Sequence, residues 1–597
     1  MAAAASPSHS DKDLASIAEA RALARRAKEA QAILGEFSQA QVDAVIDAMA
    51  AAVTPQAEPL ARLAVEETGF GVVADKVQKN LFSSQNVYEF IRPMKTVGVI
   101  NRLEDRKVIE IAEPFGVVAA VIPSTNPTST AIYKILIAIK ARCAVVMTPH
   151  PSAARCITCA ADIMNEAGRR AGLPEGAIGW MTTVTLEGTQ ELMKAREVSV
   201  ILATGGMGLV RAAYSAGKPA YGVGPGNAPC YIESSADVRK AASDILIGKA
   251  FDNGVLCSSP NSVVVDQAIE AETRRQFIEQ GGYFLSVAEA DTLARQLVTP
   301  QRLPNPAFVG KPATFIAQKA GITVPANTRA LIAELKGVGR DHPLSIEKLC
   351  PVLSYYVVKD WREGCDRCKE ILRYGGMGHT MSIHSQNDAV ILEFGLHKPA
   401  YRICVNTPTT HGSIGLTTGL DPAMTLGCGG FGGNITSDNI SPKHLLNIKR
   451  VAYELRPAQV PRFQGSRVPG LTPAQNSGTV EPWNHGTADS MKLPKVRKES
   501  APEPISSATL TSRIDKFLET RGLVRAKPLE PMERLEPLEP LESSKPAVPE
   551  TFVCEADVQN AVKTGQKLLI GERTIVTPAA RDAGEAARIF LHVGWTS

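Results

Sequence analysis

The sequence predicts an α/β protein of several domains, followed by a long C-terminal tail of different character. Its 597 residues are enough for more than one domain. From about residue 96, short β-branched runs that end at Gly, Pro or Ser alternate with helix-like segments, and a second alternating block runs from about 235 to 425. Such alternation is typical of parallel sheets covered by helices. We therefore expect an ordered α/β region that ends near residue 457.

Composition excludes several classes of protein. Hydrophobic residues make up 44% of the chain and charged residues 21%, and the net charge of +4 comes without a basic block, so nothing supports nucleic acid binding. No stretch approaches the roughly 20 apolar residues that span a bilayer, and the start has no apolar core of signal-peptide length. We expect a soluble cytoplasmic protein without a membrane partner.

The eleven cysteines are scattered and odd in number, which favours reduced thiols over a disulfide framework. Cys156/Cys159 and Cys365/Cys368 form CxxC pairs, but both pairs lie in helix-like surroundings without a second pair at zinc-site spacing. We interpret them as structural and predict no metal site.

The ordered region begins with helices over residues 12 to 65, where apolar residues recur at three- and four-residue spacing. Strands are then expected in "VGVINR", "KVIEIAEPFGVVAAVIPS" and "CAVVMTPHPS". Helices are expected in "STAIYKILIAIKAR" and "AARCITCAADIMNEAGRRAG". The first α/β block should thus be a parallel sheet between helices.

The tail after residue 457 divides into four segments. Residues 458 to 503 are rich in Pro, Gly, Ser and charge, as in a flexible linker. Within 504 to 523, one helical face carries Leu510, Ile514, Phe517 and Leu518, and a lone amphipathic helix of this length needs a partner surface. Residues 524 to 550 contain the three-residue repeat "PLEPMERLEPLEPLE", which suits a stiff polyproline spacer. Residues 551 to 597 read as helix, strand and helix, with Pro578 near the start of the second helix.

One cysteine stands in a setting that raises a chemical question. Cys257 lies in "FDNGVLCSSPNSVVV", between a glycine-bearing turn and a β-branched run. A cysteine among apolar neighbours is more often inert filling than a nucleophile, because burial keeps its thiol protonated. Motifs elsewhere in the chain must therefore decide whether Cys257 is a buried filler or a nucleophile.

Five motifs, in this order, resemble those of CoA-acylating aldehyde dehydrogenases, in particular the aldehyde dehydrogenase half of bifunctional aldehyde-alcohol dehydrogenases. They are "EPFGVVAAVIPSTNPTSTAIYK", "ILATGGMGLVRAAYSAGKPAYGVGPGN", "FDNGVLCSS", "EKLCPVLSYY" and "LGCGGFGGNITSDNISPKHLLNIKR". The resemblance covers residues from about 15 to 457, and no alcohol dehydrogenase half follows. It implies the aldehyde dehydrogenase fold: a Rossmann-type cofactor domain, an α/β catalytic domain and an oligomerisation arm that usually gives dimers or tetramers.

The resemblance also assigns roles to single residues. Cys257 becomes the nucleophile that passes from a thiohemiacetal to a thioester, and Asn126 joins the Cys257 backbone N–H in holding the oxyanion. For the cofactor NAD, Thr204, Gly205 and Gly206 should face the pyrophosphate, His150 should lie near the adenosine ribose and Glu347 should bind the nicotinamide ribose. Alone, Asn126 reads as a turn residue and Glu347 as a surface residue. The G-x-G-x-x-G in "GCGGFGG" lacks a following helix, so we interpret it as a loop near the catalytic centre.

Two departures from hydrolytic aldehyde dehydrogenases narrow the function. Those enzymes carry a glutamate that activates water against the thioester, whereas the matching stretch here, "YGVGPGN", contains no acid. Coenzyme A then becomes the expected acyl acceptor, and a hydrolytic enzyme that forms a free acid is the alternative. In "TPHPSAA", His150 and Ala153 replace a lysine and a glutamate that hold the adenosine ribose in many relatives, so NADP is also compatible.

Further expectations concern the base, the partners and the location. His411, in "NTPTTHGSIG", is a candidate base for the coenzyme A thiol, although a hydrogen-bonded loop histidine explains it equally well. Residues 505 to 523 resemble peptides that tether such enzymes to the shell or cargo of bacterial microcompartments, but docking on the enzyme's own domain is an alternative. A scaffold with a vestigial enzyme domain is a third interpretation, which Cys257, Asn126 and Glu347 together oppose. The aldehyde is left open among acetaldehyde, propionaldehyde, lactaldehyde and sulfoacetaldehyde.

These interpretations divide the chain into seven parts. They are 1–233 for the cofactor domain with part of the arm, 234–425 for the catalytic domain, 426–457 for the return to the cofactor domain and arm, 458–503 for the linker, 504–523 for the amphipathic helix, 524–550 for the spacer and 551–597 for a small C-terminal segment.

Overall fold

The computed structural model describes residues 9–456 and parts of the C-terminal region, namely 552–571, 574–576, 580, 583–584, 587 and 589–593. The chain divides into two compact units, Met1–Gln464 and Gly465–Ser597. The predicted linker, amphipathic helix and spacer at 458–550 lie outside the described residues. Within the described part, no helix is both long and apolar enough to cross a membrane.

The first sheet of the larger unit has five parallel strands. Their order is β5 (Ile178–Trp180), β4 (Val145–Pro149), β3 (Val117–Ile122), β6 (Val198–Thr204) and β7 (Ala220–Val223). Successive side chains of a strand point to opposite faces. Val118 and Ala120 therefore pack among residues of α6 (Pro127–Lys140) and α7 (Ala154–Arg170), whereas Val117 and Ala119 face α1 (His9–Gly35) and α8 (Leu186–Lys194).

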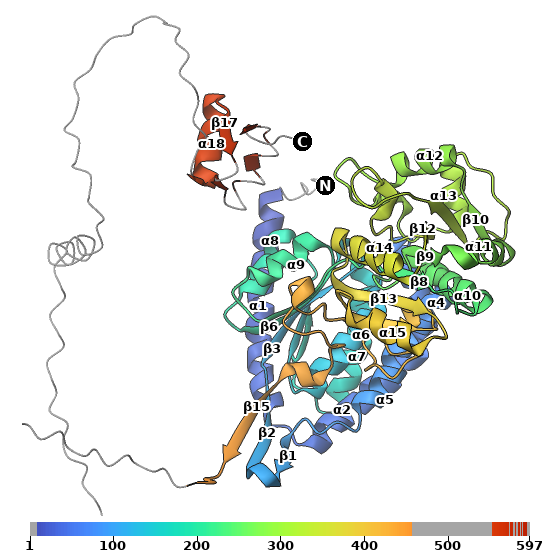
Figure 1. Cartoon of the computed structure of the whole chain (residues 1–597). Helices are drawn as coiled ribbons and strands as arrows, with labels where there is room; N and C mark the ends of the chain where they lie inside the picture. Colours follow the sequence, from blue (N-terminus) through green and yellow to red (C-terminus); the bar gives the residue numbers. More distant parts are fainter. Residues whose placement is uncertain are drawn as a thin grey trace, which may run out of the picture. The chain divides into compact units, whose positions relative to one another are not determined.

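The remaining helices of this layer extend the two faces (Figure 1). The helices α2 (Gln39–Val53) and α3 (Ala57–Thr68) pack against α7, and α4 (Val73–Leu81) and α5 (Val87–Ile91) contact α6. On the other side, α9 (Met207–Tyr214) follows β6 directly. Helices on both faces explain why the central strand β3 is buried along its whole length.

The second sheet has seven parallel strands. Their order is β10 (Gly282–Phe284), β11 (Ala330–Glu334), β12 (Val352–Val358), β9 (Ser262–Asp266), β8 (Pro229–Ile232), β13 (Gly378–His384) and β14 (Ala400–Val405). The helices between the strands are α10 (Val238–Ala250), α11 (Glu270–Glu279), α12 (Val287–Leu297), α13 (Ala313–Lys319), α14 (Trp361–Tyr374) and α15 (Asp388–Leu396), and α16 (Thr409–Ser413) follows β14. Buried clusters with α10 and α11 on one face and with α14 and α15 on the other form its core.

Two strands that the sequence suggested for the parallel sheet belong to a separate antiparallel ribbon. β1 (Gly98–Leu103) and β2 (Val108–Pro114) pair with each other, and β15 (Leu446–Ala452) pairs with β2 along its full length. The prediction was wrong here because the connection between β1 and β2 is a short turn, and parallel neighbours need a crossover of a dozen or more residues. Figure 1 shows the three strands running together beside the end of α2.

The described part of the smaller unit has a cluster of apolar residues around α18 (Glu555–Thr564). β16 (Phe552–Val553) pairs with β18 (Ile575–Val576), and β17 (Leu568–Gly571) pairs with β19 (Phe590–Val593), both in parallel. The sequence indicated the helix and the strand after it but not β19. Pro578 lies outside the described residues.

Candidate active site

A cavity of about 530 Å³ lies at the carboxyl ends of the strands of the first sheet. Its walls are the ends of β3, β4, β6 and β7 with the loops that follow, together with residues on segments that lead into strands of the second sheet. Ligands of open parallel sheets bind at this edge. The cavity brings together seven of the eight predicted site residues, which are Asn126, His150, Thr204, Gly205, Gly206, Cys257 and Glu347.

Cys257 reaches the cavity from a tightly turned loop after α10. Asp252, Asn253 and Gly254 have φ angles of 47°, 53° and 73°, so three successive residues adopt the left-handed conformation before the cysteine. Such a conformation is uncommon for residues other than glycine, and it persists only where the surroundings hold it. The Asn253 side chain supplies part of that hold by donating to the Gly310 carbonyl at 2.9 Å.

The resting thiol of Cys257 is protonated. Burial raises its pKa to about 12, and the nearby Glu347 and Cys428 add to this, whereas Arg402 lowers it. A thiolate is the reactive form of cysteine. Attack by Cys257 therefore needs a proton acceptor.

The loop after β6 has the features of a site for the cofactor pyrophosphate. Thr204 ends β6, and Gly206 is the residue before α9, whose first backbone amides lack helical partners. In the part of the chain that the structure describes, the buried Thr204 hydroxyl has no hydrogen-bond partner. A Cβ on Gly206 would meet nothing within 4 Å, so the loop leaves open space there. These residues fit a bound dinucleotide.

His150 lines the cavity directly after the end of β4. Its Nδ1 accepts a hydrogen bond from the Ser152 backbone N–H at 3.2 Å, and partial burial lowers its pKa, so the ring is neutral at pH 7. Among the described residues that line the cavity, Glu347 is the one carboxylate. The position of His150 therefore carries no acidic side chain that would repel the 2′-phosphate of NADP.

Glu347 lines the same cavity as the loop after β6 and Cys257. Its Oε1 accepts from the Gly226 backbone N–H at 2.8 Å, and burial raises its pKa to about 8, against the lowering effects of that hydrogen bond and of Lys249. The carboxyl is therefore largely protonated at neutral pH. It can then both donate to and accept from a ribose hydroxyl.

Glu347→Gln should increase the rate at which iodoacetamide alkylates Cys257 above pH 8. The Glu347 charge raises the pKa of the thiol, and the uncharged amide removes this effect. The difference in alkylation rate between the variant and the wild type should increase as the pH rises through about 8, where Glu347 loses its proton. Peptide mapping by mass spectrometry measures the rate at Cys257. Glu334→Gln, at the end of β11, is the matched control, and equal rates in all three proteins would contradict this electrostatic coupling.

The eighth predicted residue, His411, is not among the described residues that line the cavity. It lies on α16 with its ring edge-on to Phe251, centroids 4.7 Å apart, and burial lowers its pKa. Its Nδ1 is buried without a partner within the described chain. Its role as a base stays a prediction.

Sequence reasoning missed a second histidine, His379, which lies next to the Cys257 backbone across Gly226. His379 on β13 is fully buried, and its Nδ1 lies 2.9 Å from the Thr380 hydroxyl, whereas its Nε2 has no partner among the described residues. A Cβ on Gly226 would come within 3.0 Å of the His379 ring and 2.2 Å of the Cys257 carbonyl oxygen. Gly226 thus lets the backbone pass between the two residues. In the sequence, His379 is a histidine at the start of a run typical of a buried strand. Without the fold, such a histidine is interpreted as a core residue.

The "GCGGFGG" loop lies near Cys257, as the resemblance implied. Arg402 is buried and binds the Gly427 carbonyl, and its Nη1 donates to the Ser437 carbonyl at 2.9 Å. Both Arg402 and Cys428 act on the pKa of Cys257. Within the described residues, no group of three or more His, Cys, Asp and Glu side chains is placed to hold a metal ion.

Comparisons with known proteins agree with this geometry. Residues 9–283 match the model of the aldehyde dehydrogenase family. The bifunctional aldehyde-alcohol dehydrogenase AdhE of Escherichia coli K12 is 42% identical over 441 residues, which cover 73% of this chain and 49% of that protein. The chain thus spans about half the length of such bifunctional relatives. The acetylating succinate-semialdehyde dehydrogenase of Clostridium kluyveri is 37% identical over 74% of this chain and 97% of its own.

Solved structures share the fold over nearly their whole length. An acetylating aldehyde dehydrogenase from Geobacillus thermoglucosidasius is 49% identical, with a TM-score of 0.73, over 74% of this chain and 98% of its own. A propionaldehyde dehydrogenase from a Clostridium phytofermentans fucose utilisation microcompartment is 30% identical (TM-score 0.65; 72% and 96% covered). The Rhodopseudomonas palustris propionaldehyde dehydrogenase, solved with bound CoA and an acylated cysteine, is 25% identical (TM-score 0.66; 73% and 97% covered). With the motifs, the cavity and these relatives in agreement, the chain belongs to the acylating aldehyde dehydrogenase family.

Proposed function

We propose that this protein oxidises a short-chain aldehyde with NAD⁺ and coenzyme A to acyl-CoA, NADH and a proton. The observation that carries the proposal is the single cavity that holds Cys257, Asn126, Glu347 and the cofactor loop together. Relatives that are named acetylating and a relative solved with CoA and an acylated cysteine support it.

In the proposed reaction, the Cys257 sulfur bonds to the aldehyde carbon as its thiol proton passes to solvent, and the carbonyl π bond opens to leave the oxyanion of a thiohemiacetal. The Asn126 amide and the Cys257 backbone N–H donate to the oxyanion that forms. NAD⁺, which the loop at Thr204–Gly206 and Glu347 would hold, would supply the hydride acceptor for the same carbon, and the acyl group would then remain on Cys257 as a thioester. The thiolate of coenzyme A then attacks the thioester carbonyl, and the Cys257 sulfur leaves as acyl-CoA forms.

The choice of acyl acceptor rests on the missing water-activating acid. The loop at Val223–Pro225 lines the cavity without a carboxylate, and Glu347 is held by the Gly226 backbone with its pKa raised to about 8. Hydrolysis to a free acid is the second candidate, with Glu347 as its base. Chromatography of the products from aldehyde, NAD⁺ and coenzyme A distinguishes them: acyl-CoA supports the proposal and free acid supports the alternative.

His379 and His411 are the two candidates for the base that accepts the coenzyme A proton. His379 lies beside the Cys257 backbone with a free Nε2, but burial lowers its pKa to about 3, as does Arg402, so it stays neutral. His411 is neutral as well. We favour His379, because a Cβ on Gly226 would touch both the His379 ring and the Cys257 carbonyl oxygen, which places this ring next to the nucleophile.

The substrate and cofactor preferences follow from the cavity wall. Val255 and Leu349 line the cavity beside Cys257, and no lysine or arginine is among its described lining residues. This favours acetaldehyde, propionaldehyde or lactaldehyde over sulfoacetaldehyde, whose sulfonate would need a cation. Without an acid at His150, both NAD and NADP fit the adenosine end, and we expect turnover with either.

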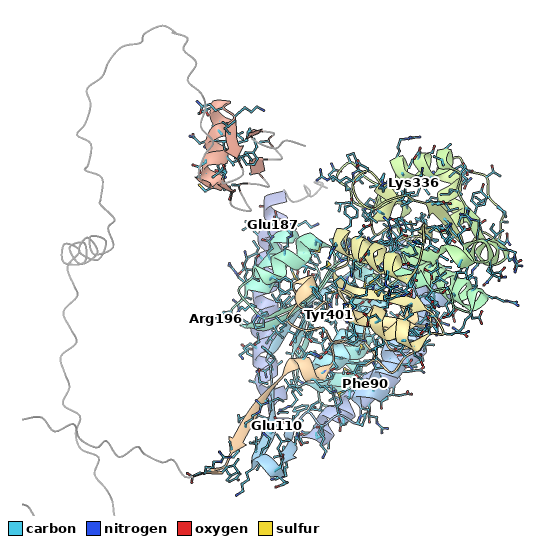
Figure 2. All side chains as sticks on the ribbon, in the orientation of Figure 1. Phe90, Glu110, Glu187, Arg196, Lys336 and Tyr401 are labelled. Carbon is cyan, nitrogen blue, oxygen red and sulfur yellow. The ribbon has the colours of Figure 1, made fainter. Side chains whose placement is uncertain are left out.

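We also propose a homo-oligomer, a dimer or tetramer, built through the antiparallel ribbon and the edge strand β14. Val99 and Val451 on the ribbon are 41% exposed each, and Tyr401 on β14, labelled in Figure 2, is 42% exposed. Apolar side chains on exposed strand edges favour pairing with another chain.

The tail supports a proposal on location, that residues 505–523 bind a microcompartment shell or cargo protein. One solved relative comes from such a compartment, and the sequence of this segment predicts an amphipathic helix, which would need a partner. Deleting residues 500–597 should preserve aldehyde oxidation but abolish co-sedimentation with shells, whereas deleting only 524–597 should preserve both. Co-sedimentation of the longer deletion would contradict the proposal.

A further inference from the structure

A buried cluster of charges lies beside the cavity, and nothing in the reaction described above uses it. Lys76 and Lys79 on α4 are 1% and 2% exposed, and both ammonium groups bind Oδ2 of Asp252, which is 0% exposed. The cluster is closed by the Asp252 backbone N–H, which donates to Asp75 at 2.7 Å. Two buried ammonium groups on one carboxylate cost considerable desolvation, so a role beyond stability is expected.

Lys79 makes one contact that Lys76 does not. Its Nζ donates to Oδ1 of Asn126 at 2.7 Å, whereas the Lys76 Nζ donates to the Thr125 backbone carbonyl at 3.1 Å. An ammonium group has no acceptor, so the Asn126 atom that faces Lys79 must be the amide oxygen. The Asn126 nitrogen therefore lies on the other side of the amide, where it donates one hydrogen to the Thr125 hydroxyl at 3.1 Å and keeps a second.

We infer that Lys79 is a positioning residue for Asn126: it fixes the amide so that an N–H, and not the oxygen, is presented to the substrate oxyanion. The inference rests on the proposed function, because it assumes that Asn126 holds this oxyanion. The terminal torsion of an asparagine is soft and roughly two-fold, so an unheld amide would spend part of its time with the repulsive oxygen forward. An ammonium on the oxygen also polarises the amide and strengthens its N–H as a donor.

Asp252 both keeps Lys79 charged and connects the loop of Asn126 to the loop of Cys257. Burial lowers the pKa of Lys79 to about 7, and the Asp252 charge opposes this, so the carboxylate helps to keep the ammonium charged. Asp252 also lies in the left-handed turn that leads to Cys257 and accepts from the Val72 backbone N–H at 2.7 Å. One ion cluster therefore ties the loop that carries the oxyanion amide to the loop that carries the nucleophile.

A double-mutant cycle tests this role. Lys79→Met should lower kcat/KM for the aldehyde about 10²-fold, close to the effect of Asn126→Ala, because either change removes an oriented oxyanion donor. In the Asn126→Ala background, Lys79→Met should change kcat/KM less than about threefold, because residues that act as one unit are not additive. KM for NAD⁺ should stay near the wild-type value. A merely structural lysine would produce the same loss in both backgrounds, which would overturn the inference.

Lys76→Met is the matched control, because it removes an ammonium from the same cluster but no contact to the Asn126 side chain. It should lower thermal stability about as much as Lys79→Met and leave kcat/KM within a few-fold of the wild type. Lys79→Gln keeps a donor for the Asn126 oxygen and should recover part of the activity. This variant also provides the test if Lys79→Met fails to fold. Equal losses of activity in Lys76→Met and Lys79→Met would overturn the inference. A wild-type protein without CoA-dependent turnover would instead refute the proposed function.

Discussion

Cys257→Ala should reduce NADH formation by a factor on the order of 10⁴ or more, because it removes the atom on which the acyl group is held. NAD⁺ binding, measured by fluorescence titration, should be preserved, since the cofactor loop at Thr204–Gly206 lies on the other sheet. Incubation of the wild type with acyl-CoA should add one acyl group, seen by intact mass spectrometry, and the variant should stay unmodified.

Cys159→Ala is the control for this prediction. Cys159 is also a free, half-buried thiol, but it lies on α7 away from the described lining of the cavity. Its replacement should leave the rate of NADH formation and the acylation unchanged. Substantial NADH formation by Cys257→Ala, or an acyl group on another cysteine, would contradict the assignment of the nucleophile.

Asn126→Ala should lower kcat by about 10²- to 10³-fold, the usual loss when one oxyanion donor is removed. KM for the aldehyde should change little, because the contact strengthens only as charge develops on the oxygen. Steady-state NADH kinetics measure both constants. Asn126→Asp, which has nearly the same shape but no N–H to donate, should lose at least as much activity. Near wild-type kcat in either variant would mean that another group holds the oxyanion.

The sequence indicated the local elements well and the long-range partners poorly. Runs such as "CAVVMTPHPS" predicted β4 because β-branched content and terminal turn residues are local signals. The short connection between β1 and β2 is a local signal of antiparallel pairing, but β15, which pairs with β2, lies more than 300 residues further along the chain. No local pattern carries that information.

The candidate active site likewise combines features with a local sequence signal and features that depend on long-range contacts. The surroundings of Cys257 raised the question of its role, but Cys257, Asn126 and Glu347 all gained their roles only from the family resemblance. The contact between Lys79 and Asp252 joins residues 173 positions apart, and His379 meets the Cys257 backbone only across Gly226. Buried polar residues of this kind resemble core residues until the fold shows what they touch.

The most direct measurement is NADH formation by the purified protein with acetaldehyde or propionaldehyde, in the presence and absence of coenzyme A. With coenzyme A, we predict sustained turnover. Without it, we predict at most a single burst that does not exceed the concentration of Cys257, because the thioester has no efficient acceptor. Full turnover without coenzyme A would contradict the acylating function and would mean that water, activated by Glu347 or another base, resolves the thioester.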